Sequence, residues 1–258
     1  MQVACCQFDI AWENKPANFR KVAGMVREAE LEPGTLLVLP EMFASGYSMN
    51  AAALTEPAAG ETASFLSTLA SGHRIYALGG VAVRGPDGKP RNESLVFDPH
   101  GQAVARYAKA YPFSPAREGA HYAAGDDIVT FDWSGCRVAM TVCYDLRFPE
   151  LYRRAAGKAD LFTVIASWPI ARDAHWMALL RARAIENQAY VAGCNRCGKD
   201  PKFTYSGRSQ VIDPHGEVAA DAGGDERIIR ADVNLSLLRE YRQKLPFLGD
   251  IRRDPGGV

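Results

Sequence analysis

The tetrapeptide Asp-Pro-His-Gly occurs twice in this chain of 258 residues, at positions 98–101 and 213–216. The first copy lies between two strand-like runs, 94–97 and 102–107. Asp, Pro and Gly are residues typical of the tight turns that join antiparallel strands. The second copy also follows a strand-like run. The repeat therefore suggests two similar halves, each carrying a hairpin.

Strand-like and helical patterns alternate before both copies. Residues 3–8 are apolar enough for a buried strand, apolar residues recur every three or four positions from 14 to 29, and 35–39 is again strand-like. This order forms a βαβ unit, which places the loops after its strands at one edge of the sheet. Further strands are predicted at 75–83, 128–131, 138–142, 161–166, 190–194 and 210–212, and further helices at 60–71 and 175–188.

These elements predict an α/β fold with two mixed β-sheets, because βαβ units and antiparallel hairpins occur in the same halves. We expect a four-layer sandwich, in which two sheets pack together and helices flank them. With 47% hydrophobic and 23% charged residues, the composition is that of one large core, so 1–250 is predicted to be a single domain. Residues 251–258 are predicted to form a C-terminal tail.

The charge and the apolar runs indicate the kind of partner. The formal net charge is zero, which gives no electrostatic reason for binding nucleic acid or an anionic membrane. No apolar run approaches the roughly 18 residues of a membrane span, and the first residues lack the pattern of a signal peptide. We therefore expect a cytoplasmic protein with a small-molecule partner, whose six cysteines are free thiols.

Cys143 lies where a predicted strand meets a sharp turn, and a helical pattern begins after Pro149. A side chain at such a join projects from a rigid sheet into a cleft walled by loops. The first N–H groups of the following helical turn have no partner within it. This position is therefore suited to a thiolate nucleophile.

Two other chemically active residues also follow predicted strands, Glu41 and Lys109. An unperturbed thiol is mostly protonated at neutral pH, so a nucleophilic cysteine needs a base or a nearby cation. Glu41 can accept the proton, and Lys109 can stabilise the thiolate and, with the Tyr144 N–H, the oxyanion of a substrate carbonyl. Each residue alone is more simply a solvated charge or part of the core, but the three together favour catalysis.

Three motifs in order resemble those of the nitrilase superfamily of carbon-nitrogen hydrolases: LPEMFxxGY at 39–47, YAK at 107–109 and CYDLRFPELYR at 143–153. The resemblance covers nearly the whole chain. It implies an αββα fold, homodimers packed sheet to sheet, and a Glu-Lys-Cys triad formed by Glu41, Lys109 and Cys143. It also implies a second glutamate, matched by Glu118, that orients Lys109 or the attacking water; an exposed loop charge is the alternative for Glu118.

Within the superfamily, the motif after Cys143 and the run SWPxxR at 167–172 most resemble the ω-amidase-like branch, which hydrolyses side-chain amides of short 2-oxo acids. Ser167 stands where relatives often have Asn. Arg172 is a candidate for binding a substrate carboxylate, because guanidinium pairs with carboxylate through two hydrogen bonds, and a structural ion pair is the alternative. Loops around Tyr47 and Trp168 are expected to set the pocket depth, which makes both candidate substrate-binding residues.

The expected enzyme is thus an amidase that needs no cofactor or metal and cleaves a 2-oxo dicarboxylic acid monoamide through a thioester. Deaminated glutathione, an N-carbamoyl amino acid or a nitrile are alternative substrates for the same triad. A binding module on the same scaffold is an alternative of another class. Cys194 and Cys197 form a CxxC motif, but no second pair lies at zinc-finger spacing, so core packing is favoured over redox or zinc chemistry.

Overall fold

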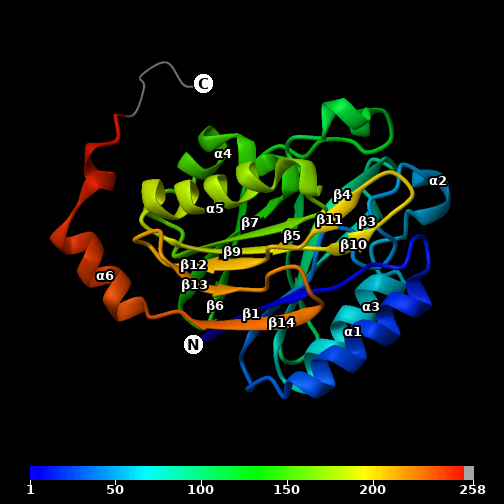
Figure 1. Cartoon of the computed structure of the whole chain (residues 1–258), viewed down its shortest axis with the longest axis horizontal. Helices are drawn as coiled ribbons and strands as arrows, with labels where there is room; N and C mark the ends of the chain where they lie inside the picture. The colour runs from blue at the N-terminus through cyan, green and yellow to red at the C-terminus, as the bar shows by residue number, and fades with distance from the viewer. Residues whose placement is uncertain (253–258) are drawn as a thin grey trace.

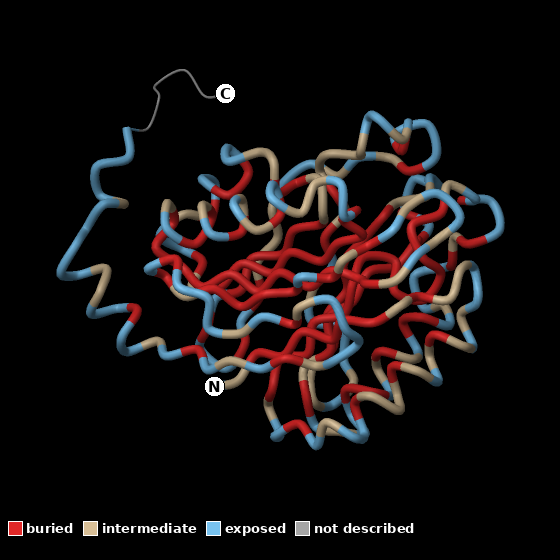
Figure 2. Tube along the Cα trace, in the orientation of Figure 1, coloured by how far each residue is buried: buried red, intermediate tan, exposed pale blue. Residues whose placement is uncertain are grey.

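Two six-stranded β-sheets packed face to face form the centre of the molecule, with helices on the outer faces (Figure 1). The computed structural model describes residues 1–252. Buried chain is concentrated in the two sheets, and the outer sides of the helices are exposed (Figure 2). The predicted four-layer α/β sandwich with two mixed sheets is confirmed.

The first sheet contains the five strands of the N-terminal half and, at one edge, a strand from the C-terminal end of the chain. Its order is β14 (Arg227–Asp232), β1 (Gln2–Gln7), β2 (Leu36–Val38), β3 (Tyr76–Arg84), β4 (Pro90–Phe97) and β5 (Ala103–Ala108). Strands β1, β2 and β3 are parallel, β4 and β5 continue as antiparallel strands, and β14 is antiparallel to β1 at the other edge. The first Asp-Pro-His-Gly turn joins β4 to β5, as predicted.

The second sheet repeats this topology. Its order is β13 (Val218–Asp221), β12 (Gln210–Ile212), β9 (Tyr190–Asn195), β8 (Leu161–Ala166), β7 (Cys136–Val142) and β6 (Val129–Trp133). Strands β7, β8 and β9 are parallel, β12 and β13 are antiparallel, and β6 pairs antiparallel with β7. The second Asp-Pro-His-Gly turn joins β12 to β13. The two halves inferred from the repeated tetrapeptide are therefore alike in strand order and direction.

Three apolar clusters hold the four layers together. The central one joins the facing sides of the sheets and includes Val38 from β2 and Val142 from β7. The second packs the first sheet against α1 (Lys15–Ala29) and α3 (Glu61–His73), and the third packs the other sheet against α4 (Pro149–Arg153) and α5 (Asp173–Asn187). Asn14 caps α1 by accepting a hydrogen bond from the Ala17 N–H, which orients the helix at its start.

Several elements were not predicted. They are α2 (Ala51–Leu54), β10 (Cys197–Lys199), β11 (Thr204–Ser206), β14, α6 (Leu235–Lys244) and the 3-10 turns η1 (Ser114–Ala116), η2 (Glu118–Ala120), η3 (Cys143–Arg147), η4 (Ile170–Arg172) and η5 (Phe247–Asp250). Most are short, and β14 carries three charged residues that mask its strand pattern. The predicted tail begins where η5 ends, and its residues 253–258 lie outside the described part. Within 1–252, no helix has the length and apolar character needed to span a bilayer.

Candidate active site

Strand direction brings the candidate residues to one edge of the sandwich. Glu41 comes shortly after β2, Lys109 directly after β5 and Cys143 directly after β7. Strand β5 runs in the same direction as β2, because two antiparallel pairings separate it from β3. The Ser167 N–H, just after β8, donates to Glu41 Oε2 at 2.9 Å and so links the two sheets at this edge.

Glu41 is held in a tight loop against the neighbouring strand. A Cβ added at Gly80 on β3 would lie 2.7 Å from the Glu41 Cα, so only glycine allows this approach. Met42, the next residue, has a φ of 46°, in the left-handed region. The loop therefore turns immediately after Glu41. The Glu41 side chain is completely buried.

Lys109 lies between two buried carboxylates. Its Nζ donates to Glu41 Oε1 at 2.8 Å and to Glu118 Oε2 at 2.9 Å. Glu41 and Glu118 are 0% exposed and Lys109 is 1% exposed, so the charges compensate one another away from water. Burial lowers the pKa of Lys109, but the two carboxylates outweigh it and raise that pKa well above its usual value. Lys109 is therefore a permanent cation here, and Glu118 is not an exposed loop charge.

Glu118 is the most heavily bonded of the three. Its Oε2 also accepts hydrogen bonds from the Tyr47 hydroxyl at 2.8 Å and the Phe113 N–H at 2.7 Å. Burial disfavours its charge, yet the charge of Lys109 and hydrogen bonds from Asn92, Lys109 and Phe113 hold the pKa of Glu118 below its usual value. Glu118 is thus an ionised residue that fixes the position of Lys109.

Cys143 occupies a strained turn between β7 and α4. Its φ is 48°, which costs a non-glycine residue energy and is typical of functional turns. Asp145 supports the turn: its carboxylate accepts hydrogen bonds from the Val142 N–H at 2.9 Å and the Tyr107 hydroxyl at 2.7 Å. Burial raises the pKa of Asp145 to about 6. The predicted strand, sharp turn and helix are confirmed, although the turn is the 3-10 helix η3 and α4 has five residues.

The resting form of Cys143 is the thiol. Burial and the charge of Glu41 raise its pKa well above the usual value, and Lys109 and the Ser167 N–H lower it less. A thiol with a raised pKa reacts through a base that removes its proton as the new bond forms. Two carboxylates, Glu41 and Glu118, raise the pKa of this thiol, and Glu41 has the larger effect.

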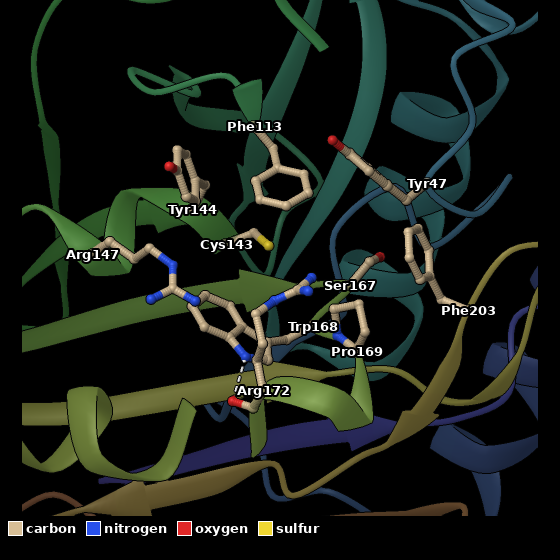
Figure 3. A pocket seen from close by; sticks show the side chains of 10 residues that line it. All are labelled: Tyr47, Phe113, Cys143, Tyr144, Arg147, Ser167, Trp168, Pro169, Arg172 and Phe203. Atoms are coloured by element: carbon tan, nitrogen blue, oxygen red, sulfur yellow. Dashed lines mark hydrogen bonds between the residues drawn. The ribbon is translucent and has the colours of Figure 1, made fainter. Parts of the chain in front are cut away.

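The Cys143 sulfur opens into a pocket of about 370 Å³, including its mouth (Figure 3). Ten residues line it: Tyr47, Phe113, Cys143, Tyr144, Arg147, Ser167, Trp168, Pro169, Arg172 and Phe203. Cys143 is partly exposed, whereas the other five cysteines are buried. The candidate substrate-binding residues Tyr47, Trp168 and Arg172 are all in this wall. The sequence interpretation missed Phe113, Arg147 and Phe203 as pocket residues.

Two guanidinium groups face the pocket. Arg147 lies over the Trp168 ring at 4.8 Å and is 3.2 Å from His175 Nδ1, and Arg172 lies over the Phe113 ring at 5.4 Å. Neither arginine takes part in an ion pair within residues 1–252, so the alternative of a structural ion pair for Arg172 finds no support there. The pocket wall contains no Asp or Glu. An anionic group on a ligand would therefore be attracted here.

Other candidates from the sequence take no part in the pocket. Cys194 and Cys197 are buried thiols in and after β9, and Cys194 Sγ donates to the Val38 carbonyl at 3.1 Å. Arg183 on α5 pairs with Glu186 at 2.8 Å and is 4% exposed. Its guanidinium donates to the Leu146 carbonyl, which ties α5 to η3. Among residues 1–252, no group of three or more His, Cys, Asp or Glu could hold a metal ion.

Comparison with known proteins agrees with this geometry. Residues 2–243 match the carbon-nitrogen hydrolase family model. The chain is 37% identical to the 2-oxoglutaramate amidase of Bacillus subtilis over 255 residues, covering 98% of each chain. It is 40% identical to the omega-amidase YafV of Escherichia coli K12, covering 97% of this chain and 96% of that one.

Solved structures show the same relationship. A CN-hydrolase superfamily protein from Xanthomonas campestris, with an arsenic adduct in its active site, has a TM-score of 0.92 and 31% identity, covering 98% of this chain and 97% of that one. Saccharomyces cerevisiae Nit3, a member of branch 10 of the nitrilase superfamily, has a TM-score of 0.86 and 30% identity, covering 95% of this chain and 94% of that one. The chain therefore belongs to the carbon-nitrogen hydrolase family, in the nitrilase superfamily, as an enzyme that hydrolyses carbon-nitrogen bonds other than peptide bonds.

Proposed function

We propose that this protein is an ω-amidase, which hydrolyses the side-chain amide of a 2-oxo dicarboxylic acid monoamide of the 2-oxoglutaramate or 2-oxosuccinamate type. The observation that carries the proposal is a pocket containing both the Cys143 sulfur and two guanidinium groups that form no ion pair within residues 1–252. A ligand with an amide at one end and a carboxylate at the other matches both features. The names of the relatives, 2-oxoglutaramate amidase and omega-amidase, agree with it.

The proposed reaction proceeds through a thioester. As Cys143 Sγ attacks the amide carbon, its proton passes to Glu41, while the Lys109 ammonium and the Tyr144 N–H stabilise the oxyanion. Tyr144 is the second residue of η3, where an N–H has no partner within the turn. Glu41 then protonates the leaving nitrogen, which departs as ammonia. A water molecule deprotonated by Glu41 attacks the thioester, releasing the dicarboxylic acid and the Cys143 thiol.

Arg172 and Arg147 are expected to bind the substrate carboxylate. Replacing either with Gln should raise KM for 2-oxoglutaramate about tenfold to hundredfold, because a hydrogen bond to a charged group contributes about 1.5–3 kcal/mol. Initial rates against substrate concentration measure this change. Hydrolysis of an uncharged amide such as butyramide should change less than threefold in the same variants. An equal loss for both amides would contradict a carboxylate-binding role.

A substrate panel tests the function itself. Ammonia release should be fastest with 2-oxoglutaramate or 2-oxosuccinamate, and slower with deaminated glutathione, N-carbamoyl amino acids and nitriles. A higher kcat/KM for one of the other compounds would move the proposal to that substrate class. If no compound is turned over, the alternative of a non-catalytic binding module on the same scaffold is favoured.

We also propose that the protein acts as a cytoplasmic homodimer. Leu237 on α6 is 60% exposed and Phe247 in η5 is 53% exposed, and a second copy would cover such apolar side chains. These elements extend away from the sheets at one end of the molecule (Figure 1). Light scattering after size-exclusion chromatography should give the mass of two chains. A mass of one chain at micromolar concentration would contradict the dimer.

A further inference from the structure

Asn92 is a buried amide that contacts both carboxylates of the site but does not line the pocket. It lies on β4 and is 1% exposed. Its Nδ2 donates to Glu41 Oε1 at 2.7 Å and to Glu118 Oε1 at 3.0 Å, and its backbone carbonyl accepts the Lys109 N–H at 2.9 Å. One residue therefore contacts both carboxylates and the backbone of Lys109.

The orientation of this amide follows from its neighbours. Both acceptors are carboxylates, which cannot donate when ionised, so the NH₂ group and not the oxygen must face them. The Oδ1 atom has no hydrogen-bond partner within residues 1–252. Asn92 therefore acts here only as a double donor, and it adds no charge to a site that already holds two carboxylates and one ammonium.

Counting donors distinguishes the two oxygens of Glu41. Oε1 accepts hydrogen bonds from Lys109 and from Asn92. Oε2 accepts only the Ser167 N–H among the described residues, so it has one donor fewer than Oε1. Ser167 and Cys143 both line the pocket, so Oε2, which accepts the Ser167 N–H, is the Glu41 oxygen on the side of the nucleophile.

The same count shows what Asn92 does for Glu118. The Oε2 of Glu118 accepts from Lys109, Tyr47 and the Phe113 N–H, whereas its Oε1 accepts only from Asn92 within the described chain. Without Asn92, Glu118 Oε1 would be a buried carboxylate oxygen without a donor, next to the carboxylate of Glu41. Such an oxygen is stabilised by rotating towards Lys109 or by taking up a proton, and either change disturbs Glu41.

We propose that Asn92 is a positioning residue that occupies Glu41 Oε1, so that Oε2 alone receives the proton from Cys143 Sγ. The proton transfer breaks the S–H bond and forms an O–H bond on Oε2, with the electron pair left on sulfur for attack on the substrate. The amide also keeps Glu118 ionised, and so keeps Lys109 between the two carboxylates. This inference rests on the proposed function only in assigning Glu41 as the base.

The test compares Asn92→Leu, which has no donor, with Asn92→Ser, which has one. In Asn92→Leu we expect kcat for 2-oxoglutaramate to fall about 100-fold, as for other misplaced catalytic groups, with KM changed less than threefold. The acidic limb of the kcat/KM profile should move up by about one pH unit, because the carboxylate pair loses a donor that favours its ionised form. In Asn92→Ser the acidic limb should lie at a pH between those of the wild type and Asn92→Leu.

The titratable groups that interact electrostatically with this pair come from several elements, and the variants leave them in place: Lys109, Cys143, Tyr47, Tyr122 and Tyr205. The limb can also be measured without following amide hydrolysis, as the rate against pH at which iodoacetamide alkylates Cys143 with loss of iodide. If the wild-type protein alkylates with an acidic limb but hydrolyses no amide, the proposed function fails while the inference about Asn92 is still tested.

Asn187→Leu is a matched control. Asn187 is also a buried amide that donates, to the Arg183 carbonyl at 2.9 Å, and its Oδ1 also has no partner within the described residues. Its replacement should lower the Tm without moving either limb. If Asn92→Leu does not fold, Asn92→Ser decides the question. The proposal would be overturned if the folded Asn92 variants had the same acidic limb as the wild type. A kcat of these variants within threefold of the wild-type value would overturn it as well.

Discussion

Replacing Cys143 with Ala should lower kcat for 2-oxoglutaramate by about 10⁴-fold or more, since loss of a nucleophile removes the covalent route entirely. The protein should still fold, because Cys143 is partly exposed and its left-handed turn is supported by hydrogen bonds to Asp145. A positive φ is no worse for Ala than for Cys. Ammonia release measures the rate, and circular dichroism with a thermal melt confirms folding.

Cys136→Ala is the control for this prediction. Cys136 is a buried thiol at the start of β7, the strand that precedes Cys143, and it lies in the central core away from the pocket. Its replacement should cost some stability and leave kcat within about threefold, as expected for a core substitution without catalytic contacts. Activity of the Cys143 variant comparable to that of the Cys136 variant would refute the nucleophile assignment.

Replacing Lys109 with Met should abolish detectable turnover and lower the free energy of unfolding by about 3–5 kcal/mol, the usual cost of removing one partner of a buried ion pair. Two completely buried carboxylates would be left without their cation. Urea unfolding followed by tryptophan fluorescence measures the change. The wild-type pKa of Lys109 is raised by the same carboxylates, so at neutral pH the cation contributes its full stabilisation.

The pH dependence of this variant has a definite sign. Without Lys109, burial and mutual repulsion raise the carboxylate pKa values in the folded state above the unfolded values. Such a group contributes stability below its unfolded pKa and loses that contribution as the pH rises through its folded pKa. The loss relative to wild type should therefore be larger at pH 8 than at pH 5. In Lys109→Met with Glu118→Gln, one charge is gone and part of the stability should return; no recovery would contradict this account.

Much of the fold followed from local patterns. The strands β8 and β12 were predicted at their observed bounds, and α1 and α5 within about two residues, because their apolar residues recur at strand or helix spacing. The repeated tetrapeptide correctly indicated two similar halves. Strand β14 was missed because it has charged residues at an exposed sheet edge, and its pairing with β1 joins residues more than 200 positions apart.

In the active site, too, some residues could be predicted from local sequence patterns and others could not. The sequence pointed to Glu41, Lys109 and Cys143 as candidate catalytic residues, because a reactive side chain directly after an apolar strand has few structural reasons to be there. The three family motifs that contain these residues made that prediction more specific. Asn92 and Arg147 gave no such signal. Asn92 is 51 positions from Glu41 and lies inside a strand, and Arg147 resembles any surface arginine of a short helical turn until Trp168 is seen beneath it.

The sequence by itself determined which elements form and which side chains stand at their ends, because apolar periodicity, turn residues and strand boundaries are local properties of the chain. Only the tertiary structure decided which oxygen of Glu41 has fewer donors, that Glu118 is buried, and that two guanidinium groups share a pocket with the Cys143 sulfur. These features depend on the packing of two sheets whose contacting residues are far apart along the chain. Their distances and burial therefore exist only after the sandwich has closed.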